Sequence, residues 1–182
     1  MITAREDLFG FAPVIPAIKA VSSVLTIGAR TRVETQSPTD PAITTLGTVL
    51  VELDPSAELV SEVTPMIQGT AQAVDVARST VSASSASVGE VFEMTAFTEP
   101  DSLIATFVET RFMSLVPTPF GDLWVRAIAR VIDFGRADAN GERFFSVVVP
   151  PIARGFPIVL QPIALSISGE LTIGVASGIV MN

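Results

Sequence analysis

The sequence predicts an all-β protein built as an antiparallel β-sandwich, with an N-terminal arm and one short helix. Runs rich in Val, Ile, Phe and Thr recur with apolar and polar residues in alternation, and 12 Gly and 13 Pro residues punctuate the 182 positions. Asn140-Gly141 lies between two apolar runs, and this dipeptide is a strong hairpin signal. Many short strands separated by Gly and Pro turns are typical of sandwiches and barrels.

The N-terminal segment is expected to form an arm that lies on a surface. Pro13 and Pro16 prevent a long helix there, and the residues at 21–27 alternate like a strand. We therefore predict an arm with a first strand over residues 1–30, followed by a single β-sandwich domain over residues 31–182.

The middle of the chain is less regular. A polar loop at 31–42 precedes a strand at 43–53. Apolar residues at helical spacing predict the short helix at 56–64, which Pro65 interrupts. The Ser-rich segment 79–88 is interpreted as an exposed connection, with a flat edge strand as the alternative. No internal repeat is found.

The second half of the chain is expected to be a succession of strands. A hairpin at 122–149 organises it, with Trp124, Arg126 and Arg130 alternating on one face of the first strand and apolar residues on the other. Such a sheet buries one face and presents the other to water or to a partner. The remaining strands are expected at 90–97, 102–116, 158–168 and 171–179.

The composition indicates more apolar surface than a soluble monomer needs. Hydrophobic residues make up 48% of the chain and charged residues only 16%, against about 25% charged in an average domain. The chain therefore enters a membrane or buries a second surface against other chains. The most apolar windows, 11–29 and 156–181, contain Pro, Gly and charged residues, so we expect no membrane partner.

Catalytic chemistry has little support in the sequence. The chain contains no His, Tyr or Cys, which excludes Ser-His-Asp and Cys-His catalysis and the usual His/Cys zinc sites. The close carboxylate pairs Glu52/Asp54 and Glu90/Glu93 are expected to be solvated charges, and no motif supports Ser-Lys chemistry with Lys19. We predict no catalytic residue, no cofactor and no enzymatic activity.

Metal and nucleic-acid binding are also not expected. Asp138, Asn140 and Glu142 offer oxygen ligands at alternate positions, like half of a calcium loop, but a hairpin turn already explains them. The net charge is −8 and the eleven basic residues are scattered, so contact with nucleic acid is predicted to be weak or absent.

A subunit interface is the favoured use of the apolar surface. Phe9 and Phe11 on the arm, with Trp124, Arg126 and Arg130 on the hairpin, are the residues expected to form it. The two arginines either meet a carboxylate or phosphate of a partner or pair with acidic residues across their own sheet. The predicted partners are copies of the same chain.

The order of the segments resembles a known family. An apolar N-terminal arm, about eight strands with long loops, and the closing stretch 164–174 are similar to the single jelly-roll coat proteins of small icosahedral viruses, the tymovirus-like coats among them. This chain departs from the family in lacking a basic arm for packaging RNA, and residues 56–80 match no jelly-roll strand.

The resemblance implies a jelly-roll subunit that assembles into the shell of a virion, where other virion proteins are further partners. One alternative is a bacteriophage accessory protein of the decoration, tail-tube or neck type. A β-sandwich module that binds a carbohydrate or protein ligand is a second alternative, and an enzyme that uses carboxylates is a third.

Overall fold

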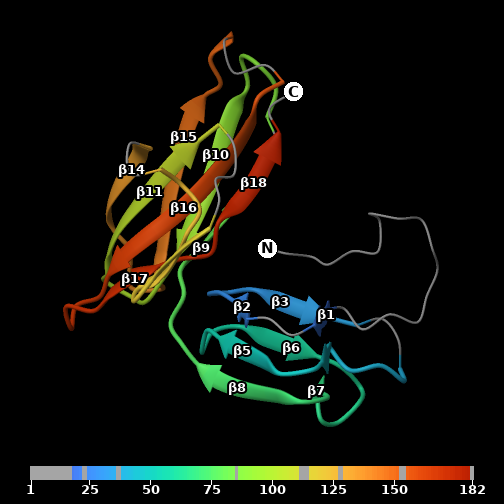
Figure 1. Ribbon diagram of the computed structural model, residues 1–182. Helices are drawn as coiled ribbons and strands as arrows, with labels where there is room; N and C mark the ends of the chain where they lie inside the picture. Colours follow the sequence, from blue (N-terminus) through green and yellow to red (C-terminus); the bar gives the residue numbers. More distant parts are fainter. Residues whose placement is uncertain are drawn as a thin grey trace. The chain divides into compact units, whose positions relative to one another are not determined.

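Strands dominate the structure, which is a computed structural model (Figure 1). They make up 56% of it with almost no helix, which confirms the all-β prediction. The chain divides into two compact units, Met1–Val76 and Ala77–Asn182. The boundary predicted after residue 30 thus differs from the observed one. The structure describes residues 18–21, 24–35, 38–84, 86–110, 115–126, 129–151 and 155–180.

The N-terminal unit is a parallel β-solenoid. Its three sheets have the strand orders β1-β4-β7, β2-β5-β8 and β3-β6, and every pair is parallel. Ile18, Ile43 and Ile67 lie side by side, so the chain returns to the same face once per coil. The strands are β1 (Ile18–Val21), β2 (Val24–Ile27), β3 (Arg32–Glu34), β4 (Ile43–Leu46), β5 (Val49–Leu53), β6 (Glu58–Val60), β7 (Ile67–Gln68) and β8 (Ala71–Asp75).

Inward-facing aliphatic residues hold the coil together. Ile43 and Val51 are fully buried, and they lie in the middle turn with neighbours stacked on both sides. Gly47 has a φ of 72° and forms the corner between β4 and β5, a backbone conformation that favours glycine. The single strand expected at 43–53 is therefore two strands on two faces.

Two predictions for this unit are wrong. The segment predicted as a helix at 56–64 contains the strand β6, because the chain there pairs with β3 in parallel register, Arg32 beside Glu58. The sequence also contains a structural repeat that was not found. Each coil repeats apolar positions with different residue types, such as Leu25, Val51 and Ala73, which are register partners in one row.

The C-terminal unit contains two antiparallel sheets, named here by their central strands. The β10 sheet has the order β15-β10-β9, and the β11 sheet has the order β14-β11-β16, with β17 and β18 both paired to the far edge of β16. The strands, including a small separate hairpin β12-β13, are β9 (Thr80–Ala83), β10 (Val91–Phe97), β11 (Leu103–Glu109), β12 (Val116–Thr118), β13 (Gly121–Leu123), β14 (Arg130–Arg136), β15 (Glu142–Val148), β16 (Pro157–Leu165), β17 (Leu171–Ile173) and β18 (Ser177–Val180).

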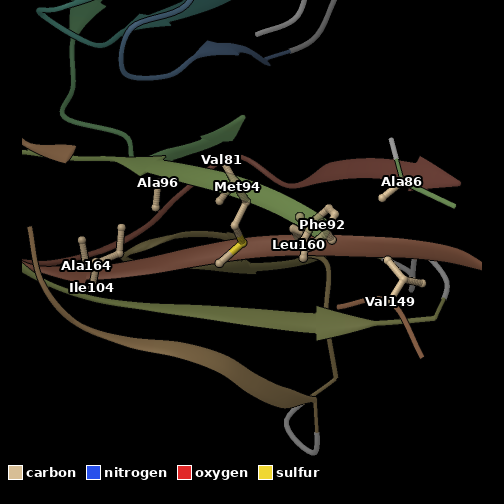
Figure 2. Close-up of a cluster of buried hydrophobic side chains, with 9 residues drawn as sticks. All are labelled: Val81, Ala86, Phe92, Met94, Ala96, Ile104, Val149, Leu160 and Ala164. Atoms are coloured by element: carbon tan, nitrogen blue, oxygen red, sulfur yellow. The ribbon is translucent and has the colours of Figure 1, made fainter. Parts of the chain in front are cut away.

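The two sheets share one apolar core, shown in Figure 2. Phe92 and Met94 from β10 meet Ile104 from β11 and Leu160 from β16, and all four are at most 2% exposed. The alternation along β10 buries every second residue, as expected for a strand with one face on the core. This arrangement is consistent with a β-sandwich.

The predicted hairpin at 122–149 is wrong, although its turn forms. The amide of Gly141 donates to the carbonyl of Asp138 and closes the turn, yet β14 pairs with β11 and β15 pairs with β10. The chain therefore passes from one sheet to the other at this turn. A bidentate ion pair between Arg143 and Asp133, 2.7 Å in each contact, links the two strands instead of a backbone ladder.

Other strand predictions for this unit are confirmed. The expected strands at 90–97 and 158–168 correspond to β10 and β16, and the expected turn after β16 forms at residues 166–170. The single strand expected at 171–179 is two strands, β17 and β18, which pair with different parts of β16. The strand predicted at 102–116 ends earlier, with β11 at Glu109. Residues 80–83 form the edge strand β9, so the edge-strand alternative for this segment was right.

Candidate interaction surface

Among the residues that the structure describes, no group of three or more acidic, His or Cys side chains is placed to hold a metal. Asp138 acts as a turn residue, because its Oδ1 accepts hydrogen bonds from the amides of Asn140 and Glu142 at 2.8 and 2.9 Å. Within the same described residues, no helix has the length and apolar character needed to cross a membrane.

The outer face of the β11 sheet is the surface that stands out. Along β11, Ile104, Thr106 and Val108 point toward the core, so Leu103, Ala105, Phe107 and Glu109 point outward. The partners of these outward residues on β16 also point outward. This face is apolar over most of its length, and the chain covers only part of it.

A segment at residues 115–126, here called the strap, crosses part of this face. Gln161 on β16 is fully buried beneath it and makes three hydrogen bonds. Its Oε1 accepts from the amide of Trp124 at 2.9 Å, and its Nε2 donates to the carbonyls of Asp122 at 2.7 Å and Gly174 at 3.0 Å. This amide side chain satisfies two backbone groups of the strap where it crosses β16, and the amide of Ile173 on β17 satisfies a third by donating to the carbonyl of Phe120 at 2.7 Å.

An ion pair fixes the end of the strap. Arg126 donates from Nε and Nη2 to the two carboxylate oxygens of Glu109, at 2.7 and 2.8 Å. The hydrogen bonds from Arg126, followed by one from the amide of Thr110, lower the pKa of Glu109 to about 2, although burial acts in the opposite direction. The carboxylate in turn raises the pKa of Arg126. Both charges are therefore neutralised locally.

Two rows of outward residues cross the sheet beside the strap, which reaches the end of the second row, where the amide of Ile173 donates to the carbonyl of Phe120 at 2.7 Å. The first row is Arg136, Leu103, Leu165 and Leu171, which are direct neighbours on β14, β11, β16 and β17. The second row is Phe134, Ala105, Ile163 and Ile173 on the same strands.

Most of the large side chains in these rows are open to water. Phe134 is 65% exposed, and Ile167 at the tip of the following turn is 77% exposed. We call the exposed apolar residues of this face the bare patch. They are Leu103, Val131, Phe134, Leu165, Ile167 and Leu171. A sheet face of this kind is usually covered by protein, because isolated monomers rarely expose contiguous apolar surface of large area.

The outer face of the β10 sheet is different. Val91, Glu93, Thr95 and Phe97 alternate with the buried residues of β10, so the outward row mixes charged, polar and apolar side chains. Phe144 is exposed beside Thr95. The register partners Val91 and Val148 are also exposed on this face, but the rows of mostly aliphatic residues that cross four strands are found on the β11 sheet.

The structure places the predicted interface residues in different settings. Trp124 and Arg126 come together on the strap, where Trp124 is half-buried and Arg126 pairs with Glu109. Their predicted alternation along one strand is wrong, because the strap end is not part of a strand. Arg130 is exposed at the start of β14, and Phe9 and Phe11 lie outside the described residues.

The bare patch was not singled out from the sequence. The alternation in residues 103–109 did indicate two faces for that strand, and the structure confirms both faces. Choosing which face is open needs the strand order of the sheet and the path of the strap. Neither is readable from one sequence, because both depend on contacts between distant segments.

Comparison with protein-family models, curated proteins and solved structures gives no match to this chain.

Proposed function

We propose that this protein is a structural, non-enzymatic subunit that works by self-assembly, in the class of virion proteins that the segment order resembles. The bare patch on the β11 sheet carries the proposal. The bare patch accounts for part of the apolar excess in the composition. Burial between copies of the chain would remove such a face from water.

The coat-subunit form of this proposal draws support from the strand pairing. The pairs β10-β15, β11-β14 and β12-β13 are nested in the sequence, as in a long hairpin that has been folded over itself. A jelly roll is built from antiparallel pairs of this type. In a shell, copies of the chain and other virion proteins would be the partners, and nucleic acid would make little contact.

The alternative is an accessory virion protein of the decoration, tail-tube or neck type. The N-terminal unit favours it. Of the segment that was expected to be an arm with a first strand, the described residues 18–21 and 24–30 belong to a solenoid with its own buried core. A subunit with two separate cores suits a component that bridges to other proteins. It suits this role as well as it suits a closed shell of single sandwiches.

Light scattering coupled to size-exclusion chromatography tests the proposal on the purified full chain. We expect a species several times the 19.1 kDa chain mass at micromolar concentration. A megadalton particle would support the coat subunit, and a ring or small oligomer would support the accessory protein. A stable 19.1 kDa monomer at every concentration tested would overturn self-assembly and favour a sandwich-type binding module.

A further inference from the structure

We propose that the peptide bond between Asp40 and Pro41 is a self-cleavage site, at which the side-chain carboxyl group of Asp40 breaks its own backbone. The bond lies in the N-terminal unit, between β3 and β4. The inference is independent of the proposed self-assembly, because it concerns a bond within one chain. It is carried by a buried carboxyl oxygen, a hydrogen bond to the carbonyl of the bond, and the rigid attachment of the chain that follows.

The carboxyl group of Asp40 has an oxygen that the fold does not use. Oδ2 is buried, and within the described part of the chain it has no hydrogen-bond partner. A buried acceptor without a partner is costly, so such a group in a native structure calls for an explanation, and a role in chemistry is one of them. The other described side chains in this condition, Ser102 and Thr106, present hydroxyl groups. Asp40 differs from them because its carboxyl group is next to a bond that it can attack.

The backbone carbonyl of Asp40 is polarised by a serine. The hydroxyl group of Ser61 donates a hydrogen bond to this carbonyl oxygen at 2.8 Å. The same hydroxyl oxygen accepts from the amide of Val63 at 3.0 Å, which fixes its position. A donor held at a carbonyl oxygen stabilises the negative charge that develops there when a nucleophile attacks the carbon. Ser61 therefore acts as an oxyanion donor for this bond.

The chain on the other side of the bond is held in place. Pro41 and Ala42 are buried, and the carbonyl of Ala42 accepts from the amide of Ile18 at 3.1 Å. The nitrogen of Pro41 has no N–H group, so no backbone hydrogen bond holds the leaving atom itself. A carbonyl that is fixed on both sides loses little freedom when the neighbouring carboxyl group approaches it, which lowers the entropic part of the barrier.

The reaction needs only acid and water as co-reactants. Oδ2 of Asp40 attacks the carbonyl carbon of the same residue and forms a cyclic anhydride, while the bond from that carbon to the nitrogen of Pro41 breaks. The electron pair of the broken bond stays on the nitrogen, which takes a proton from the solution. Water then opens the anhydride. One product ends in Asp40 with free side-chain and terminal carboxyl groups, and the other begins with the secondary amine of Pro41.

A second bond of the same type provides a control within the same molecule. Asp54 also precedes a proline, Pro55. Its Oδ1, however, accepts from the amide of Ser56 at 2.9 Å and from the hydroxyl group of Ser56 at 2.6 Å. These hydrogen bonds hold the carboxylate in a turn and stabilise its charge, which makes it a poorer nucleophile. The fold should therefore promote cleavage after Asp40 and suppress cleavage after Asp54.

Cleavage does not by itself release the first coil of the solenoid. The strands β1, β2 and β3 precede the bond, and they pair with β4, β5 and β6, which follow it. An ion pair of 2.9 Å between Arg32 and Glu58 also joins the two sides. The fragments must therefore be separated under denaturing conditions before they are quantified.

Mass spectrometry of the full chain tests the proposal. The chain is incubated at about pH 4, where aspartic acid side chains in model peptides titrate, or at the lowest pH at which circular dichroism shows it folded. We expect fragments 1–40 and 41–182. They should form at least about tenfold faster than the fragments from cleavage after Asp54, because only the first bond has an oxyanion donor and an unpaired nucleophile. In denaturing urea at the same pH, the two bonds should break at similar rates.

Substitutions at Ser61 separate the folded site from simple acid lability. Ser61→Ala should slow cleavage after Asp40 at least about tenfold, because the oxyanion donor is lost. Ser61→Thr keeps a hydroxyl group and should restore most of the rate. Ser56→Ala makes the same change beside the other bond and should leave cleavage after Asp40 unchanged. Asp40→Asn removes the nucleophile and should abolish it.

The direction of the Ser61→Ala effect is decisive. Cleavage that proceeds through local unfolding would become faster in this variant, because a hydrogen bond that stabilises the loop is lost. A faster rate, equal cleavage after Asp40 and Asp54 in the folded chain, or no cleavage after Asp40 would each overturn the proposal. The readout is fragment mass, so it does not depend on whether the chain assembles, and its failure leaves the proposed function standing.

Discussion

At the residue scale, one glutamine and one glutamate determine the path of the strap. Gln161 binds its backbone at two points, and Glu109 holds Arg126 at its end. Both side chains are on the outer face of a sheet whose other outward residues are mostly apolar. Their burial is stable because each polar atom of these contacts has a partner, so the cost of removing them from water is offset.

The Glu109–Arg126 pair makes the strap sensitive to strong acid. The pKa of Glu109 is about 2, below its ordinary value of 4.5, so the folded state favours the charged carboxylate. The stability that this group contributes is therefore full above about pH 4.5 and is lost as the pH falls through 2. We expect Glu109→Gln to lower the melting temperature by about 3 °C at pH 7, with the gap to the natural chain closing toward pH 2.

The single tryptophan of the chain supplies a second readout for this prediction, because Trp124 lies on the strap. Its fluorescence should shift to longer wavelength as the strap loosens, and Glu109→Gln should show part of this shift already at pH 7. A melting-temperature gap that stays constant from pH 7 to pH 2 would contradict the assignment of this ion pair.

At the scale of elements, the turn at Asp138–Gly141 is the corner at which the chain changes sheets. Gly141 has a φ of 78°, and a Cβ built on it collides with the carbonyl oxygen of Thr98. Gly169 has a similar φ of 85° and open space around the position of a Cβ. Substitution of Gly169 therefore tests backbone strain alone, whereas substitution of Gly141 tests backbone strain together with steric crowding.

Substitution of these glycines should have unequal effects. Gly169→Ala should cost about 1 kcal/mol, which is the penalty for an alanine in the left-handed region. Gly141→Ala should cost about 2–4 kcal/mol, because the collision with Thr98 adds to the same penalty. Denaturant unfolding measures both values. Equal costs would show that the corner yields without strain.

The elements show which features of the fold can be predicted from sequence. Alternation located β10, β16 and the start of β11 to within a few residues, because each strand has one face on a core and one outside it. The pairing of β14 and β15 was predicted wrongly, since the Asn-Gly signal identifies a turn but not the sheet that each strand joins. Short-range pattern cannot distinguish a hairpin from a corner between sheets.

The candidate site also depends on contacts between segments that are distant in sequence. Trp124 and Arg126 were predicted as interface residues because they are large side chains in an apolar run. In the structure they are bound by Gln161 and Glu109, which are distant in sequence. The bare patch is assembled from residues of β14, β11, β16, β17 and the turn after β16. No local property of Leu103 or Leu165 marks it as exposed, because buried leucines occur in runs of the same kind.

At the scale of the whole molecule, two separate cores predict two unfolding transitions. Ile43 is fully buried in the N-terminal core and Ile104 is 1% exposed in the C-terminal core. A polar amide at either site would be buried without partners, at a cost of about 3 kcal/mol or more. Ile43→Asn should lower one calorimetric transition by about 10–20 °C and leave the other in place.

The reciprocal variant is the control for this prediction. Ile104→Asn should lower the transition that Ile43→Asn leaves unchanged. A single transition that both variants shift together would show that the two units unfold as one cooperative body.

There is a physical reason why the solenoid is not predicted from the sequence. Its strands are two to five residues long, and its rows match in the direction of the side chain, not in residue type. Leu25, Val51 and Ala73 are register partners in one row although they differ in size. A search for similar residue types at a fixed period misses such a repeat. A search for apolar positions, whatever their residue type, is better suited to it.

The coiled unit has a consequence for how this chain can change over generations. Each turn touches only the turns before and after it, so a whole turn can be gained or lost with no effect on more distant parts. The step from Ile18 to Ile43 defines the length of such a cassette. Relatives of this protein would then differ in reach by whole coils, while the C-terminal unit keeps its size.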